Sequence, residues 1–510
     1  MMTSNSKTKA LLFMLLLTGT TLFNACKKND DAPAIVKPNL VFVGLTSNGA
    51  LQTYNANNVV TSTASVSISG LQSGETILAI DYRPATGQLY GLGSTSRLYI
   101  INTNSGLATV VGSGAFTPAL SGNVAGFDFN PTVDRIRVVT SGGQNLRLNP
   151  ETGTVAATDG IINGVNNVAI SSVAYTNNKA GATSTILFDL DVVAKKLYKQ
   201  DPPNNGTLVA VGDLNIPTSS GNSSFDISSN GIALASIGNG AASNLYQINV
   251  ETGAATDLGA FSGTLVGLAI PTEPIAYAVD DTNNLIIFNP TKETDQITKA
   301  LTGIPAGETL FGIDFRPANG QLYALSSASK LYTINLANGA VAQVGTLPFA
   351  LSLNGTSFGF DFNPTVDRIR VVSNAGQNLR LDPNTGLIAA TDLPLNPGTP
   401  VVNGAAYTNN FPTIAGSGAT TTLFDIDSST DRLYRQDPPN AGTLVEIGAL
   451  GVNVEAANGF DIGGKSNVAF AILTVGSTTK LYTINLTTGA ATAGVAFPKS
   501  VRGFALGLGF

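Results

Sequence analysis

The chain has 510 residues, of which 12% are charged and 55 are glycine, and its formal net charge is −6. This length allows two or more domains with sizeable cores, whereas the acidic balance and the lack of a Lys/Arg-rich run argue against a nucleic-acid partner. The sequence contains no histidine, which excludes Ser-His-Asp catalysis, Cys-His catalysis and His-ligated metal sites.

The first residues have the three parts of a secretory signal. Lys7 and Lys9 precede an apolar run over 10–17, and the sole cysteine, Cys26, directly follows Ala25. Bacterial lipoproteins carry their acylated cysteine at this place. We therefore predict lipidation of Cys26, the alternative being an ordinary signal peptide with an incidental cysteine.

This interpretation divides the N-terminal part into a signal peptide over 1–25 and a polar tether over 26–39. Phe23 departs from the lipoprotein pattern, in which Leu is commonest. Asp30 and Asp31 resemble the signals that export lipoproteins of the Bacteroidota to the cell surface, although a solvated linker explains them as well. We expect an outer-membrane lipoprotein on the periplasmic or cell-surface side.

From residue 40 onward, short apolar runs alternate with turn residues about every ten positions, which is typical of all-β proteins. Residues 77–112 contain ILAIDY, QLYGLG, RLYIIN and ATVVG, joined by turns rich in Gly, Pro and Asn. This pattern predicts a four-stranded antiparallel meander, and similar units follow at 126–158, 173–212 and 224–259. Four-stranded units of about 40 residues indicate the blades of a β-propeller.

The stretch 126–148, GFDFNPTVDRIRVVTSGGQNLRL, returns almost letter for letter at 359–381. Asp128 and Asp361 in these stretches are 233 residues apart (361−128), and so are Glu75 and Glu308 in the GET motifs upstream (308−75). The chain is therefore a tandem duplication, with one copy over 40–273 and the other over 274–510.

Each copy opens with a blade that lacks a strand and ends on a spare strand, TLVGLAI in the first copy and VRGFALGLGF in the second. Pairing the spare strand into the first blade closes a ring of five blades and removes its exposed edges. We predict two tandem five-bladed β-propellers. The alternative is one ten-bladed propeller, in which TLVGLAI forms a hairpin with IAYAVD.

Several long runs resemble a bacterial family known only as domain of unknown function 4394. They are GETILAIDYRPATGQLYGLGS, GFDFNPTVDRIRVV, GQNLRLNPETG, AYTNN and QDPPNNGTL. The resemblance covers nearly all of 40–510 as two copies. It implies a secreted or anchored β-propeller, and its single-copy members favour rings that close on themselves. It supplies no activity, substrate or catalytic residue.

The first strand of three blades in each copy carries an aspartate at the same register, and first strands line the channel of a propeller. These candidate channel or ligand residues are Asp81, Asp128, Asp226, Asp314, Asp361 and Asp461. One hypothesis is glycan hydrolysis, which uses paired carboxylates. We favour a structural role, in which arginines of the next strands form an Asp–Arg ladder with these aspartates. These arginines are Arg135, Arg137 and Arg147, with Arg368 as the counterpart of Arg135.

Asp425, Asp427 and Asp431 have the spacing of a calcium loop. Copy one has Lys195 where Asp431 stands, so we expect a plain turn and no metal site.

The recurring Leu-Tyr pairs indicate packing between blades. Their tyrosines are Tyr90, Tyr99, Tyr198, Tyr246, Tyr323, Tyr332, Tyr434 and Tyr482. The QDPPNNGTL and QDPPNAGTL segments at 200–208 and 436–444 predict tight surface turns.

Together these observations predict a lipid-anchored, extracytoplasmic binding or scaffolding protein. We expect no enzymatic activity and no cofactor. Its expected partners are the membrane, through the lipid anchor, and an unknown protein or glycan, and the chain is expected to be a monomer. The alternative is a carboxylate-dependent, glycan-active enzyme that uses the channel aspartates.

Overall fold

The computed structural model describes residues 35–510 except 123–124, 218–221, 241, 293–295 and 414–417. The predicted signal peptide, Cys26 and most of the tether lie outside the described residues. Lys37–Phe510 forms one compact unit. The described helices are two single 3₁₀ turns, η1 (Pro203–Asn205) and η2 (Pro439–Ala441). In the part of the chain that the structure describes, no helix is long and apolar enough to cross a membrane.

The described residues form forty strands in ten four-stranded antiparallel sheets, which confirms the all-β prediction. The first copy contributes five of these sheets as blades. From the inner to the outer strand they are β20 (Leu265–Ala269), β1 (Val41–Thr46), β2 (Ala50–Asn55) and β3 (Ala64–Ser67); β4 (Ile77–Tyr82), β5 (Leu89–Gly93), β6 (Leu98–Ile101) and β7 (Ala108–Val110); β8 (Ala125–Asn130), β9 (Arg135–Thr140), β10 (Asn145–Leu148) and β11 (Val155–Thr158); β12 (Ser172–Tyr175), β13 (Leu187–Asp191), β14 (Lys196–Gln200) and β15 (Leu208–Asp213); and β16 (Ser223–Ile227), β17 (Ala233–Gly238), β18 (Ser243–Ile248) and β19 (Ala255–Ala260).

The second copy repeats this arrangement. Its blades are β40 (Val501–Leu506), β21 (Ala276–Asp280), β22 (Asn284–Phe288) and β23 (Ile297–Ala300); β24 (Leu310–Arg316), β25 (Gln321–Ser326), β26 (Lys330–Ile334) and β27 (Val341–Gln343); β28 (Phe358–Asn363), β29 (Arg368–Ser373), β30 (Asn378–Leu381) and β31 (Ile388–Thr391); β32 (Val402–Tyr407), β33 (Leu423–Asp427), β34 (Arg432–Gln436) and β35 (Leu444–Ala449); and β36 (Ala456–Ile462), β37 (Ala469–Val475), β38 (Thr478–Ile484) and β39 (Ala491–Ala496).

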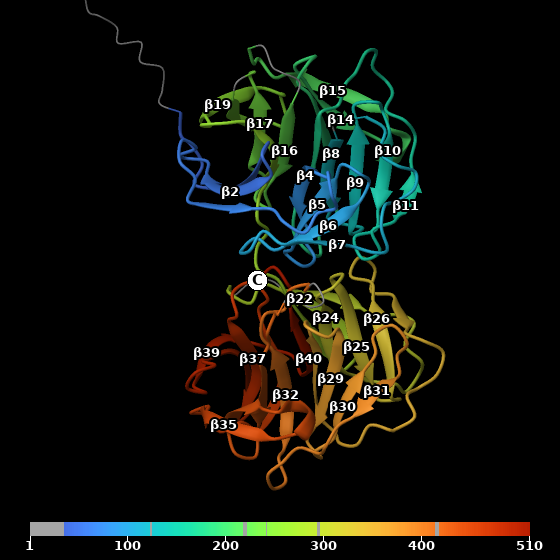
Figure 1. Ribbon diagram of the computed structural model, residues 1–510, viewed down its shortest axis with the longest axis vertical. Coiled ribbons are helices and arrows are strands. Elements are labelled where there is room, and N and C mark those ends of the chain that lie inside the picture. Colours follow the sequence, from blue (N-terminus) through green and yellow to red (C-terminus); the bar gives the residue numbers. More distant parts are fainter. Residues whose placement is uncertain (1–34, 123–124, 218–221, 241, 293–295, 414–417) are drawn as a thin grey trace, which may run out of the picture. The chain divides into compact units, whose positions relative to one another are not determined.

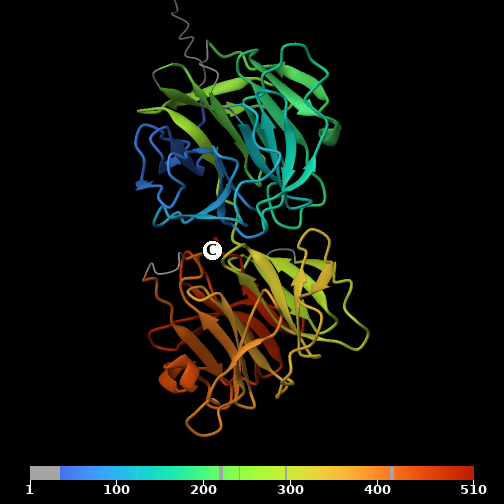
Figure 2. The same cartoon turned by 45° about the vertical axis from the view of Figure 1, so that its right-hand side comes forward.

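The last strand of each copy closes its ring. β20 pairs with β1, placing Leu268 opposite Gly44, and β40 pairs with β21, placing Phe504 opposite Ala278. β20 therefore does not continue into β21, and the ten-bladed alternative is wrong. Within a blade the strands succeed one another outward, as β8 to β11 do in Figure 1, and Figure 2 shows the same blades turned. The chain folds as two five-bladed β-propellers.

The hydrophobic core lies between neighbouring blades, because each sheet buries both of its faces. Between the β4 and β8 blades, Tyr90 meets Phe129 edge to face with ring centroids 5.1 Å apart. Tyr323 and Phe362 make the same contact in the second ring at 5.2 Å. These contacts confirm the predicted role of the two tyrosines in packing between blades.

Small residues allow the inner strands to approach closely. The second ring has glycine at one channel level of all five inner strands: Gly312, Gly359, Gly404, Gly459 and Gly503. A Cβ on Gly359 would lie 2.6 Å from the Cβ of Ala405, and one on Gly459 would lie 2.4 Å from the Cβ of Phe504. The first ring has Ala79, Gly126, Ser172, Ser224 and Gly267 at this level. A five-bladed ring thus leaves little room at its centre.

Because β20 completes the first blade from within its own copy, we predict that residues 40–273 fold without the second copy. A fragment with these ends should unfold cooperatively in urea, with coincident transitions in circular dichroism and tyrosine fluorescence. A fragment that stays unfolded in buffer would show that the first ring depends on the second.

Candidate functional site

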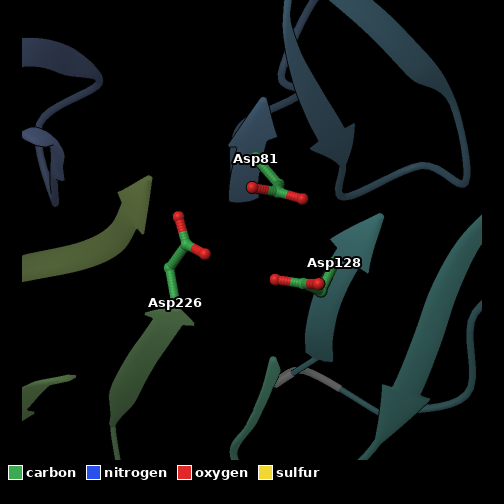
Figure 3. A group of neighbouring side chains, drawn as sticks. All are labelled: Asp81, Asp128 and Asp226. Atoms are coloured by element: carbon green, nitrogen blue, oxygen red, sulfur yellow. The ribbon is translucent and has the colours of Figure 1, made fainter. Parts of the chain in front are cut away.

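Three inner strands of the first ring bring aspartates to one place. Asp81 on β4, Asp128 on β8 and Asp226 on β16 turn their carboxylates toward one another (Figure 3). One oxygen from each lies within 4.8 Å of the others, and all three side chains are buried. The predicted convergence is confirmed. We call this group the aspartate cluster of the first ring.

The aspartates bond to backbone N–H groups of neighbouring blades. The N–H of Phe129 donates to Asp81 Oδ2 at 2.7 Å, and the N–H of Tyr175 donates to Asp128 Oδ1 at 2.9 Å. Asp226 Oδ2 accepts from the N–H of Ile270 at 2.6 Å. Each acceptor lies one blade away from its donor, so every carboxylate links two neighbouring blades at the channel.

The second ring has an equivalent aspartate cluster, formed by Asp314, Asp361 and Asp461. Their blade-to-blade donors are the N–H groups of Phe362 at 2.7 Å, Tyr407 at 2.9 Å and Leu506 at 2.6 Å. The duplicated sequence therefore builds the same three links twice.

Burial and mutual repulsion raise the pKa values of these carboxyls. Burial raises the pKa of Asp226 to about 6, and it raises that of Asp461 to about 7, while backbone N–H donors oppose both shifts. Burial, reinforced by the neighbouring carboxylates, raises the pKa values of Asp81 and Asp128 well above their usual range. Three negative charges in this space are unfavourable unless something neutralises them.

The structure does not bring Arg135 or Arg368 to the clusters. Arg135 Nη1 donates to the carbonyl of Asp134 at 2.8 Å, and Arg368 donates to the carbonyl of Asp367 at 2.8 Å. The residue opposite Asp128 in the strand register is Arg137, but its guanidinium bonds elsewhere. The predicted Asp–Arg ladder is wrong, because the channel carboxylates bond to backbone N–H groups instead.

Arg137 instead links its blade to the QDPPNNGTL loop. Its guanidinium donates to Asp159 at 2.6 Å, to Asn145 at 2.7 Å and to Asn204 in η1 at 2.8 Å. Arg147 also donates to Asp159, at 2.8 Å. The loop is thus more than a surface turn, since it is fixed to the preceding blade. The second ring repeats the contacts with Arg370, Asp392, Asn378 and Asn440.

Sequence reasoning missed this link between two distant motifs. The available signal was that GQNLRL and QDPPN occur together once in each copy. The contact between the two motifs depends on which blades are neighbours, and neither motif specifies that order.

One further buried carboxyl faces this arginine. Asp189 on β13 is fully buried, and neither of its oxygens has a hydrogen-bond partner among the described residues. Burial raises its pKa to about 8, although the positive charge of Arg137 opposes the shift. Asp425 is its counterpart on β33, with a pKa raised to about 8 by burial. Both carboxyls are therefore largely protonated at neutral pH.

The aspartates of the proposed calcium loop turn to different partners. Asp427 Oδ1 accepts from the N–H of Ser429 at 2.8 Å, and Asp431 Oδ1 accepts from the N–H of Val454 at 2.7 Å. Asp425 lies on β33 and is buried. These contacts are those of a structured turn.

A pocket of about 460 Å³ opens where the inner strands of the first ring begin. It combines hydroxyl and amide groups with aliphatic side chains. Its lining comprises Thr46, Ser47, Asn48, Gly49, Ile68, Leu71, Glu75, Thr76, Ile77, Leu78, Asn222, Ser223 and Val266. We call it the mouth pocket. Its size is within the range of small-molecule sites.

The second ring differs at the corresponding positions. By strand register Phe311 stands where the first ring has Leu78, and Arg502 stands where it has Val266. The Phe311 ring stacks on Phe358 with centroids 5.2 Å apart. The two copies therefore share their centres but differ at the mouth, where the second ring carries larger side chains. These differences between the copies are visible in the sequence, but only the structure shows that they lie at the mouth of the ring.

Asp189 provides a test of the buried carboxyls. Its pKa is about 8 in the folded chain and about 4 in an unfolded one, so between these values only the folded state holds the proton. Stability must then fall as pH rises through this window. We predict that Asp189→Asn removes part of that loss, so that from pH 5 to pH 8 the native chain loses at least about 1 kcal/mol relative to the variant in urea unfolding.

The matched control is Asp213→Asn, which replaces an exposed aspartate paired with Lys196. This control should follow the pH dependence of the native chain. Parallel curves for the native chain and Asp189→Asn would contradict the raised pKa.

The solved structures that align with this chain do so at low sequence identity and low TM-score. No curated protein matches the chain. Among solved structures, the extracellular domain of a one component system from B. thetaiotaomicron aligns at 11% identity over 91% of this chain and 66% of that chain, with a TM-score of 0.26. A Lactobacillus plantarum protein aligns at 14% identity over 66% of this chain and 98% of that chain, with a TM-score of 0.25. A chain of the nidogen/laminin complex aligns at 16% identity over 46% of this chain and 99% of that chain, with a TM-score of 0.26.

One family model matches the chain twice, over residues 50–269 and 284–505. The two matches coincide with the two rings and together cover most of the chain. The protein thus belongs to the family described as Domain of unknown function (DUF4394), of which it carries two tandem copies.

Proposed function

We propose that this protein is a lipid-anchored, extracytoplasmic binding module whose ligand enters the mouth pocket of the first ring. The observation that carries the proposal is the pocket itself, about 460 Å³ in volume, at the opening of a rigid ring. A rigid scaffold that presents a preformed concave site is the usual design of a binding protein.

The lining indicates the chemistry of the ligand. Among the described residues that line the pocket, Glu75 is the one charged side chain, and its carboxylate accepts hydrogen bonds from Thr95 and Tyr99. Ser47, Asn48 and other hydroxyl or amide groups alternate with aliphatic side chains. The pocket therefore suits a small neutral molecule that has both hydroxyl groups and an apolar face, which is the chemistry of a short glycan.

The geometry favours binding over glycan hydrolysis. A hydrolase needs two carboxyl groups beside the bond that it breaks, with access for the substrate. Asp128 and Asp226 are each only 1% exposed, and each accepts a hydrogen bond from a backbone N–H. Their burial supports a non-enzymatic role.

We predict that Leu78→Phe weakens ligand binding, because it gives the first ring the larger side chain of the second. A panel of neutral mono- and oligosaccharides would be screened against Lys37–Phe510 by thermal shift, and hits measured by calorimetry. The affinity for a hit should fall by about tenfold or more in the variant.

The matched control is Phe311→Leu, which makes the converse change in the second ring. This variant should bind with native affinity. Equal affinities of the native chain and Leu78→Phe would contradict binding in the mouth pocket, and sugar release by the native chain that Asp128→Asn abolishes would favour the enzyme alternative.

The anchor is tested separately, at Cys26. We predict that Cys26→Ser moves the protein from the membrane fraction to the soluble fraction and abolishes labelling by a radioactive fatty acid, because no thiol then remains to be acylated. The control is Thr20→Ser, which leaves the cysteine intact. A Cys26→Ser chain that stays in the membrane fraction would show that another feature attaches it.

A further inference from the structure

When they are ionised, the aspartate clusters place more negative charge at the centre of each ring than the surrounding residues neutralise. The described hydrogen-bond donors to Asp81, Asp128 and Asp226 are backbone N–H groups. Arg137 is opposite Asp128 in the strand register, yet its guanidinium bonds to Asp159, Asn145 and Asn204. Buried carboxylates usually have a charged partner or coordinate a metal ion.

A separate observation is the carboxylate of Asp128, which keeps one oxygen free. Its Oδ1 accepts from the N–H of Tyr175, whereas Oδ2 is buried and has no hydrogen-bond partner among the described residues. The carboxylate points toward Asp81 and Asp226 (Figure 3). The same oxygen of Asp361 is also buried without a hydrogen-bond partner among those residues. A buried acceptor aimed at two other carboxylates calls for a ligand.

The spacing of the oxygens fits a calcium ion. One oxygen of each aspartate lies within 4.8 Å of the other two. Calcium binds carboxylate oxygens at about 2.3–2.6 Å, so three oxygens that lie this close together can all contact one ion. Magnesium gives up its water ligands reluctantly, which disfavours it at a buried site made of three carboxylates.

We propose that each aspartate cluster binds one calcium ion, held by Asp81, Asp128 and Asp226 in the first ring and by Asp314, Asp361 and Asp461 in the second. The bonded oxygens of Asp81 and Asp226 each keep a second lone pair for the ion. The ion neutralises two of the three charges, whereas a single shared proton neutralises one. It joins three blades that the carboxylates already link through backbone N–H groups.

This site is distinct from the calcium loop that the sequence suggested at Asp425, Asp427 and Asp431. From the sequence, no metal site was predicted, and the channel aspartates were expected to bond to arginine. The proposed calcium site is also independent of the mouth pocket, so either proposal stands if the other fails.

The test is the metal content of the full-length chain, purified in detergent, stripped with a chelator, and dialysed against calcium and then against calcium-free buffer. We expect two calcium ions per chain by mass spectrometry, one for each cluster. Asp128→Asn should retain one ion, and Asp128→Asn with Asp361→Asn should retain none. Calcium should raise the melting temperature of the stripped native chain by several degrees and leave that of the double variant unchanged.

Asparagine keeps an oxygen that can accept the N–H of Tyr175, so these variants preserve the link between blades. The matched control is Asp189→Asn, which replaces an equally buried aspartate outside the clusters and should retain two ions. A native chain that holds no calcium would overturn the proposal in favour of shared protons, and this measurement requires no variant. A double variant that still holds two ions would place the calcium elsewhere, and retention of magnesium in preference to calcium would overturn the choice of ion.

Discussion

The carboxylate that joins two neighbouring inner strands is the interaction on which both rings depend. An inner strand is the edge of its sheet, so some of its backbone N–H groups face the channel without a partner in a ladder. Asp81, Asp128 and Asp226 accept three such N–H groups across blade boundaries. They satisfy buried donors at a narrow centre, and they add polar links at the channel to blades that also meet through apolar packing.

This arrangement sets the size of the residues around the channel. Carboxylates reach the next strand only if the inner strands are close, and closeness requires small side chains at the adjoining level. Gly359 and Gly459 show the limit, because a Cβ on either would overlap its neighbour. The same closeness concentrates negative charge, which burial cannot tolerate without protons or a cation. The close approach of the inner strands therefore both closes the ring and brings the buried carboxylates together.

Most of the fold could be predicted from the sequence, because repeats, turn residues and a spare strand are local features. Counting strands predicted the pairing of β20 with β1 and of β40 with β21. The convergence of the aspartates followed from their shared register. Their bonding partners did not, because the register sets Arg137 opposite Asp128 but leaves the course of a long side chain open. The contact of Arg137 with Asn204 joins two blades and depends on the closed ring.

The proposed binding site depends on the differences between the copies rather than on their similarities. The near-identical stretches contain Asp128 and Asp361, which link neighbouring blades, so ring closure accounts for their likeness without a ligand that differs between the copies. At the mouth no such constraint operates, and Leu78 and Val266 are replaced by Phe311 and Arg502. Under the proposed function, a duplicated scaffold that keeps its centre and changes one opening separates stability from recognition. Under the proposed function, the mouth of the first ring, rather than either channel, is therefore where a ligand would distinguish the two copies.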